Sequence, residues 1–294
     1  MYVCADFLYR KRWFFLEAYF IITLHIKRNG GEPAMKKVIL ISIDGMRPDG
    51  LLQCGHPFVH EMMQRGAYTL KGKSVYPSVT LPCHMSMFHS VPPERHGIMS
   101  NAYTPMVRPV RGLFEQISLF GGSCAMYYGW EPLRDVSRPE SLRFAGYVHS
   151  YAAPSTDSEL TDLALERIAK DKPEFVFLYM VETDQKGGHD HGWMSPEYLS
   201  TIHTAIGNVQ RVMETAGDEY VVVVTADHGG HDRDHGSDLW EDMTIPLFFF
   251  GEMFGAGTEL EGIGLMDLAP TITDVMSIPA VPEWEGKSIL DKTK

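Results

Sequence analysis

The sequence predicts an α/β fold of three layers, in which helices cover both faces of a doubly wound, mostly parallel central sheet. Four runs of apolar, β-branched or aromatic residues are continuous rather than alternating, which is typical of strands buried on both faces. These runs are residues 38–43, 175–181, 220–225 and 245–250. Segments with helical periodicity lie between them, and strands that alternate with helices favour a doubly wound sheet.

Two amphipathic helices are expected between these runs. The first should begin near Thr156, because Thr156 and Glu159 have the spacing of a capping box. Its apolar positions share one side and are Leu160, Leu163, Ala164 and Ile168. The second should begin near Pro196, which suits a first helical turn. Its apolar positions recur at helical spacing and are Leu199, Ile202, Ile206, Val209 and Met213.

Residues 35–294 are expected to form a single domain, and residues 1–34 a non-native or disordered extension. Met35 begins MKKVILISIDG, a natural opening for a domain whose first element is a strand. The preceding Gly30, Gly31 and Glu32 can be encoded by a purine-rich run that resembles a bacterial ribosome-binding site. Met35 is therefore the expected initiator. Residues 100–150 have weak periodicity and are expected to form an excursion over one edge of the functional site.

An alternative interprets residues 1–34 as a signal peptide. The apolar residues 13–24 follow Arg10, Lys11 and Arg12, although Glu17 interrupts them. A start at Met35 predicts a cytoplasmic protein, whereas a signal peptide predicts a secreted or periplasmic one. Four cysteines without a CxxC pair indicate neither a disulfide framework nor structural zinc, which favours a reducing compartment.

Composition excludes several classes of protein. Apolar residues make up 44% of the 294 residues and charged residues 22%, which excludes intrinsic disorder. With 26 Lys and Arg against 38 Asp and Glu, the net charge is -12, so binding to nucleic acid through a basic surface is not expected. No apolar run reaches the length of about 20 residues that a membrane-spanning helix requires. An acidic protein can still act on anionic substrates when bound cations reverse the local charge.

Three aspartates follow three of the predicted strands: Asp44, Asp184 and Asp227. Because the carboxyl ends of parallel strands line the ligand crevice of such a sheet, we expect the three to converge. Clustered histidines accompany two of them, namely His189, His191, His228, His231 and His235. Mixed Asp and His ligands suit zinc, and after it manganese, better than calcium or magnesium. The candidate ligands exceed the roughly four that one zinc-like ion needs, so two divalent ions are expected.

A nucleophile is expected at the start of a helix. Thr80 precedes Pro82, which is well placed for a first helical turn, and a helix N-terminus offers N–H groups and a positive dipole to a phosphate. Ser78 is the competing hydroxyl, and nothing in the local sequence excludes it.

These segments resemble the alkaline phosphatase superfamily, and within it the type I phosphodiesterase and nucleotide pyrophosphatase branch. The matching pieces occur in the family's order and span nearly all of the chain after Met35. They are LISIDGMRPD (40–49), YPSVTLPCHMSMFHSVPPERHGI (76–98), residues 184–192, TADHGGHDRDHG (225–236), and the tail from MDLAPTITDVM to WEGKSI. The sulfatase branch fits less well, because its modified Cys or Ser nucleophile is replaced by Thr80.

The resemblance assigns ligand roles to seven residues. It implies that one metal is held by Asp44, Thr80, Asp227 and His228, with Thr80 also the nucleophile. It implies that the other metal is held by Asp184, His189 and His235. His191 and His231 are the alternative ligands, since each lies close enough to its neighbour in sequence to compete.

The resemblance also indicates where substrate would bind. Phosphodiesterase relatives carry an Asn just after the Thr-x-Pro that helps bind a phosphoryl oxygen, and Cys83 occupies that place here. A thiol is a weaker donor than an amide, so the diesterase specificity does not transfer directly. Tyr127 and Trp130, with Tyr128 beside them, are candidates to stack on a nucleobase. Lys186, near Asp184, is a further candidate for substrate contact.

The expected function is a two-metal phosphoester hydrolase, foremost a phosphodiesterase or nucleotide pyrophosphatase with a phospho-threonine intermediate. A phosphomonoesterase or phosphonate hydrolase of the same superfamily is the first alternative, and a mutase is conceivable. A non-catalytic metal-binding protein is the alternative from another class. The expected partner is a small phosphate ester or nucleotide, without a nucleic-acid scaffold or a membrane; the oligomeric state is not predicted.

Overall fold

A mixed sheet of seven strands forms the centre of residues 35–290, the part of the chain that this computed structural model describes. The strand order across the sheet is β2-β7-β6-β1-β5-β3-β4. The strands are β1 (Lys37–Ile43), β2 (Ala67–Lys73), β3 (Cys124–Tyr128), β4 (Phe144–Tyr147), β5 (Phe175–Met180), β6 (Tyr220–Thr225) and β7 (Thr244–Phe250). Neighbours pair in parallel except β7, which is antiparallel to both β6 and β2. The mostly parallel sheet predicted from the sequence is thus confirmed.

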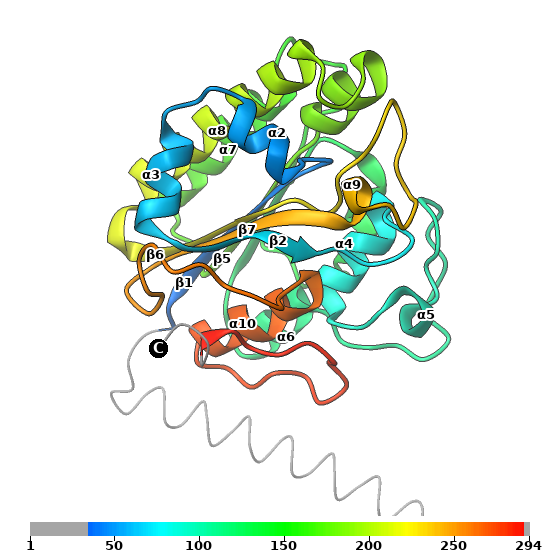
Figure 1. The fold of residues 1–294 in the computed structure, drawn as a ribbon. Helices are drawn as coiled ribbons and strands as arrows, with labels where there is room; N and C mark the ends of the chain where they lie inside the picture. Colours follow the sequence, from blue (N-terminus) through cyan, green and yellow to red (C-terminus); the bar gives the residue numbers. More distant parts are fainter. Residues whose placement is uncertain (1–34, 291–294) are drawn as a thin grey trace, which may run out of the picture. The chain divides into compact units, whose positions relative to one another are not determined.

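Helices cover both faces of the sheet, as expected (Figure 1). One face carries α2 (Pro48–Gln53), α3 (Phe58–Arg65), α7 (Thr156–Lys170) and α8 (Pro196–Ala216), and the other carries α4 (Thr80–His89), α6 (Leu113–Leu119) and α10 (Leu268–Val275). The shorter helices are α5 (Pro93–His96), α9 (Trp240–Met243), η1 (Glu131–Val136), η2 (Thr183–His189), η3 (Gly217–Glu219) and η4 (Leu265–Asp267). Every residue of β5 and β6 is buried because both faces are covered, which explains their uninterrupted apolar sequences.

The start of α7 differs from the prediction. Ser155 is the N-cap and Thr156 is already the first helical residue, so the predicted capping box does not form. The Thr156 hydroxyl donates instead to the carbonyl of Ser150 at 3.0 Å, and the Thr156 amide donates to Glu182 at 2.9 Å. The helix therefore begins at the residue whose backbone N–H is bonded by the distant side chain of Glu182 rather than by a local capping residue. Leu163, predicted on the buried side, is 41% exposed.

Helix α8 begins as predicted. Pro196 is its first residue, and the hydroxyl of the N-cap Ser195 accepts the backbone N–H of Tyr198 at 3.1 Å. Four of its five predicted apolar positions are buried: Ile202, Ile206, Val209 and Met213.

Residues 100–150 are more regular than predicted. They contain α6 and the two strands β3 and β4, which complete one side of the sheet, rather than a wholly irregular excursion. Strand β4 has four residues at the edge of the sheet and alternates between partly buried and exposed positions, so it gives no continuous apolar run. The hypotheses about residues 1–34 lie outside the described residues. Among the helices that are described, none combines the length and apolarity that a membrane span requires.

Candidate active site

The three predicted aspartates meet at one edge of the sheet. Asp44 directly follows β1, Asp227 follows β6, and Asp184 lies in the π-helix η2 that follows β5. These three strands are parallel neighbours, so their carboxyl ends lie together. His228 Nε2 lies 3.2 Å from Asp44 Oδ1 and 3.4 Å from Asp227 Oδ2. Asp44, Asp184 and His228 form a group whose donor atoms lie within 4.8 Å of one another.

A second group shares Asp184. His189 Nε2 lies 3.5 Å from Asp184 Oδ2, and His235 Nε2 lies 3.7 Å from Asp184 Oδ1. The rings of His228 and His235 stack with their centroids 3.9 Å apart, so the two groups are contiguous. The structure therefore brings together all six carboxylate and imidazole side chains that the sequence assigned to the two metals.

Hydrogen bonds to carbonyl groups fix the tautomer of the three histidines. The Nδ1 atom of His189 contacts the carbonyl oxygen of Arg233 at 2.9 Å, that of His228 the carbonyl of Gly229 at 2.7 Å, and that of His235 the carbonyl of Ser78 at 2.9 Å. A carbonyl oxygen only accepts, so each Nδ1 carries the proton and each Nε2 presents a lone pair to the site. This arrangement is typical of histidines that bind metals through Nε2.

Buried carboxylate oxygens without hydrogen-bond partners support the same interpretation. Within the described residues these atoms include Asp44 Oδ1, Asp184 Oδ1 and Asp227 Oδ2. Burial raises the pKa of all three carboxyl groups, that of Asp227 to about 7, with repulsion between the carboxylates adding to it. Lone pairs of Asp44 Oδ1 and His228 Nε2 face each other at 3.2 Å, which is unfavourable unless a cation lies between them. The donor set therefore fits divalent metal ions.

Buried partners hold the aspartates in place. The second oxygen of Asp44 accepts the hydroxyl of Tyr179, and Asp227 Oδ1 accepts the N–H groups of Gly45 at 3.2 Å and His228 at 3.0 Å. In both residues the protein anchors one oxygen and leaves the other directed to the site. Such anchoring is what orients carboxylate ligands in metal sites.

Asp157 orients the segment that carries Asp184, and the sequence analysis did not identify it. Its fully buried carboxylate accepts the N–H groups of Val181 at 2.8 Å and Glu182 at 3.1 Å, where β5 ends. Burial raises the pKa of Asp157 to about 8. No local pattern distinguishes Asp157 from an ordinary acidic residue in a first helical turn.

Thr80 is the first residue of α4, and its hydroxyl oxygen lies 3.2 Å from His228 Nε2. It is 4% exposed and lines a cavity of about 110 Å³. The residues around this cavity are Asp44, Thr80, Asn101, Trp130, Tyr179, Asp184, Gln185, His189 and His235. The competing hydroxyl of Ser78 is fully buried and donates to the carbonyl of Ser237 at 2.7 Å, away from the cavity lining.

Asn101 is a cavity residue that the sequence analysis missed. Its side-chain oxygen accepts the backbone N–H of Leu81 at 3.0 Å, so its amide group remains available to donate. Asn101 follows shortly after the matching segment 76–98, and the available clue was an amide-bearing residue in irregular chain near a helix N-terminus. That clue is weak because such residues are common in loops.

Cys83 and Tyr127 do not lie at this cavity, contrary to the prediction. Cys83 is completely buried one turn into α4, and its thiol contacts the Ser74 hydroxyl at 3.3 Å. Tyr127, on β3, is 4% exposed and lines a separate groove with Arg143 and Arg167. Strand geometry explains this difference, since Tyr127 lies within the sheet whereas Trp130 follows the end of β3 and reaches the cavity.

The remaining candidate residues, His231, His191 and Lys186, contact groups other than the predicted ligands or face solvent. The His231 Nδ1 atom lies 2.8 Å from Asp242 Oδ1, and this contact raises the pKa of His231. His191 is exposed, and neither alternative ligand belongs to the two donor groups of the described residues. Lys186 donates to the carboxylate of Glu182. His189 and His235 are thus the better placed member of each competing pair.

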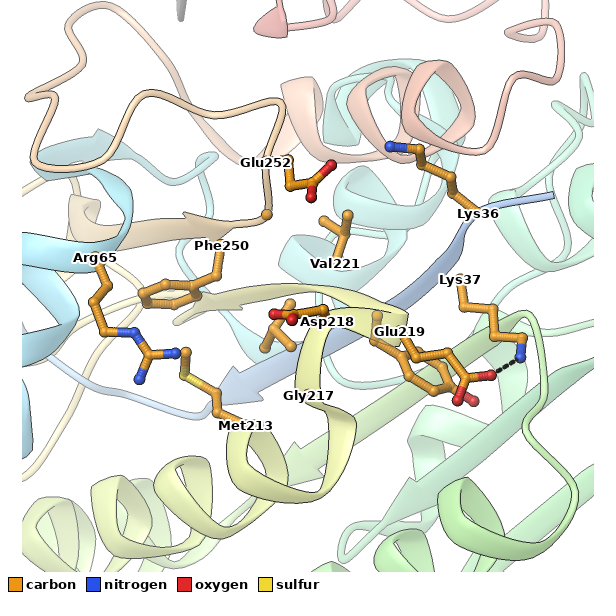
Figure 2. Close-up of a pocket in the computed structure, with 13 residues that line it drawn as sticks. Lys36, Lys37, Arg65, Met213, Gly217, Asp218, Glu219, Val221, Phe250 and Glu252 are labelled. Atoms are coloured by element: carbon orange, nitrogen blue, oxygen red, sulfur yellow. Dashed lines mark hydrogen bonds and ion pairs between the residues drawn. The ribbon is translucent and has the colours of Figure 1, made fainter. Parts of the chain in front are cut away.

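A second pocket lies at the opposite end of the strands (Figure 2). It has a volume of about 230 Å³ and includes Lys36, Lys37 and Arg65 alongside Asp218, Glu219 and Glu252. Lys37 pairs with Glu219, as the dashed line shows. The charges of these three basic and three acidic side chains cancel, and none of the predicted ligands lines the pocket. This pocket is therefore not the site of the predicted chemistry.

The sequence matches a protein-family model described as type I phosphodiesterase / nucleotide pyrophosphatase over residues 38–116 and 112–244. A curated relative, the 2,3-bisphosphoglycerate-independent phosphoglycerate mutase of Clostridioides difficile, is 28% identical over 141 residues, 46% of this chain and 27% of the relative. Ectonucleotide pyrophosphatase/phosphodiesterase family member 1 of Rattus norvegicus is 25% identical over 218 residues, 65% of this chain and 24% of the relative. The chain thus spans about a quarter of the length of these relatives.

Solved structures share the fold at low identity. Murine ectonucleotide pyrophosphatase/phosphodiesterase 5, as an inactive variant in complex with AMP, has a TM-score of 0.74 at 17% identity, covering 87% of this chain and 99% of that chain. A phosphonate monoester hydrolase from Silicibacter pomeroyi has a TM-score of 0.68 at 16% identity, covering 88% of this chain and 76% of that chain. Both similarities concern the architecture of the sheet and its helices.

Proposed function

Since this chain belongs to the type I phosphodiesterase / nucleotide pyrophosphatase family, we propose that it is a metal-dependent phosphoester hydrolase that cleaves phosphodiesters or nucleotide pyrophosphates. One observation carries this proposal. The hydroxyl of Thr80 lies at the N-terminus of α4, 3.2 Å from His228 Nε2 and beside carboxylate oxygens that lack hydrogen-bond partners. A hydroxyl in this setting suits nucleophilic attack on phosphorus better than a structural role.

Seven residues would hold two divalent ions, zinc before manganese. Asp44, Thr80, Asp227 and His228 would hold one, and Asp184, His189 and His235 the other. Ions bound there would compensate the carboxylates, lower the pKa of the Thr80 hydroxyl and stabilise charge on the phosphoryl oxygens.

The side chains of the cavity would then perform the reaction in two steps. The Thr80 oxygen would attack phosphorus in line, forming a bond to phosphorus as the bond to the leaving oxygen breaks, which gives a phospho-threonine. Water would hydrolyse this ester and regenerate the Thr80 hydroxyl. The first N–H groups of α4 carry the positive end of the helix dipole and would favour the anionic phosphoryl group.

The substrate would extend past Trp130 into an adjoining aromatic pocket. This pocket has a volume of about 260 Å³, shares Trp130 and Gln185 with the cavity, and also includes Tyr147, His149 and Tyr151. Exposed aromatic faces of this kind suit stacking on a nucleobase. The AMP complex of the murine relative supports a nucleotide as the substrate class. Trp130 remains a proposed stacking residue, and Tyr151 replaces Tyr127.

A comparison of two chromogenic esters tests the proposal. The full chain, loaded with zinc or manganese, should hydrolyse bis-p-nitrophenyl phosphate faster than p-nitrophenyl phosphate, and chelation should reduce both rates to background. A preference for the monoester would indicate a phosphatase, and activity confined to a phosphonate ester would indicate a phosphonate hydrolase. Metal binding without hydrolysis of any of these esters would favour the non-catalytic alternative.

We also propose that the Asn101 amide donates to the phosphoryl group, and replacement of Asn101 tests this contact. Asn101→Asp keeps an oxygen that accepts the N–H of Leu81 but removes the amide donor and adds a negative charge beside the substrate. We expect kcat/KM for the diester to fall by about 10²-fold or more, as when one oxyanion donor is lost. Asn101→Ala should lose less, because it adds no charge. Unchanged kcat/KM in Asn101→Asp would restrict Asn101 to capping α4.

A further inference from the structure

We infer that Trp193 is a positioning residue that holds the segments carrying the ligands of both donor groups in register. Trp193 lies between η2 and α8, is 7% exposed, and is absent from the ligand set. The inference rests on the proposed function, because positioning has a purpose only if the two groups bind metal.

The indole lies against three glycines, each adjacent or close to a ligand in sequence. Gly45 follows Asp44, Gly188 precedes His189, and Gly230 lies two residues after His228. A Cβ atom on Gly188 would lie 2.6 Å from indole carbons, one on Gly45 would lie 3.2 Å from the indole, and one on Gly230 would be closer than either. Only glycine allows such close packing, so the indole contacts the backbone of three ligand-bearing segments directly.

Hydrogen bonds connect the indole to the Asp44 segment. The Trp193 indole N–H and the Tyr198 hydroxyl each donate to the carbonyl of Gly45 at 2.9 Å. Gly45 has a φ of +66°, and its own N–H donates to Asp227 Oδ1 at 3.2 Å. The conformation of the turn after Asp44 thus depends on donors from the segment that follows His189.

The same indole contacts the imidazoles of the other donor group. Its ring centroid lies 5.2 Å from that of His189 at an interplanar angle of 85°, and 5.9 Å from that of His235. The backbone N–H of Trp193 donates to the carbonyl of Asp232 at 2.8 Å, within the loop that carries His235. A residue that only filled the core would meet apolar side chains; Trp193 meets ligand rings and ligand-bearing backbone instead.

Metal titration of two Trp193 variants tests the inference. Trp193→Phe keeps an aromatic ring but loses the N–H donated to Gly45, and Trp193→Ala removes the contacts with all three glycines. By calorimetric zinc titration of the metal-free full chain, we expect affinity to fall about 10- to 100-fold in Trp193→Ala, the usual cost of losing a partner of metal ligands. We expect a fall of about 3- to 10-fold in Trp193→Phe, the usual effect of one neutral hydrogen bond.

Trp284→Phe is the matched control. The indole N–H of Trp284 also donates to a backbone carbonyl, that of Arg111 at 2.9 Å, but Trp284 lies outside the cavity lining. Its zinc affinity should equal that of the wild type. Excess zinc should restore kcat in the Trp193 variants, and circular dichroism of the metal-free variants should equal that of the wild type, which a general loss of folding would not allow.

The outcomes separate this inference from the proposed function. Wild-type protein that binds neither zinc nor manganese would refute both. Wild-type protein that binds two equivalents, with unchanged affinity in Trp193→Phe and Trp193→Ala, would overturn the role of Trp193 alone. If Trp193→Ala does not fold, Trp193→Phe still decides, because its ring preserves most of the buried apolar surface.

Discussion

Thr80→Ala is expected to reduce kcat for the diester by at least about 10³-fold while the protein retains two equivalents of metal. Loss of a covalent nucleophile usually costs more than about 4 kcal/mol of transition-state stabilisation, because no other group can accept the phosphoryl transfer. Six ligand side chains remain after the substitution, so metal binding should persist. Initial rates on bis-p-nitrophenyl phosphate, together with metal content by mass spectrometry, would check both parts.

Ser78→Ala is the control for this prediction. The Ser78 hydroxyl donates to the carbonyl of Ser237 at 2.7 Å and lies outside the cavity lining, so its loss should lower stability by about 1 kcal/mol and leave kcat nearly unchanged. Thr80→Ser keeps a hydroxyl at the same place and should retain measurable turnover. Hydrolysis that survives in Thr80→Ala but disappears in Ser78→Ala would instead identify Ser78 as the nucleophile.

The buried strands could be predicted because burial on both faces leaves a continuous apolar sequence. Strands β1, β5 and β6 begin and end within one residue of the predicted runs. The direction of β7 could not be predicted, since a strand buried on both faces has the same composition in either orientation. Strands β2 and β4 have exposed positions, and β4 has only four residues, so neither gives a continuous apolar run.

In the candidate site too, some residue positions could be predicted from the sequence and others could not. Asp44, Asp184 and Asp227 follow parallel strands, and sheet topology alone places the ends of such strands together. Asn101, Asp157 and Trp193 acquire their positions from tertiary contacts, namely with Leu81, with the end of β5, and with three distant glycines. A single sequence carries no pattern for contacts of this kind.

Crowding of the aspartates makes metal binding and stability depend on pH. Burial first, and repulsion between the carboxylates second, raise the pKa of Asp44 well above its usual 3.8, and burial raises that of Asp227 from 3.8 to about 7. The pKa of Asp184 is raised for the same reasons as that of Asp44. A carboxyl group whose pKa is higher in the folded protein stabilises the fold fully below its unfolded pKa. That contribution is lost as the pH rises through the folded pKa, which for Asp227 is about 7.

Zinc should therefore raise the melting temperature more at pH 8 than at pH 5.5. Without metal, deprotonated Asp227 costs a few kcal/mol at pH 8, since its pKa is raised from 3.8 to about 7 and each pKa unit corresponds to about 1.4 kcal/mol, whereas a bound cation compensates its charge. At pH 5.5 the ion must instead displace the proton that Asp227 carries. For a domain of this size we expect the zinc-induced shift to differ by about 5–10 °C between the two pH values. Melting curves with zinc and with a chelator at each pH measure this difference. The pKa of Asp157 is raised with or without metal, so its contribution to the melting temperature cancels when the two curves are compared at one pH. Equal zinc-induced shifts at the two pH values would contradict this prediction, because they would mean that zinc displaces no protons from these aspartates.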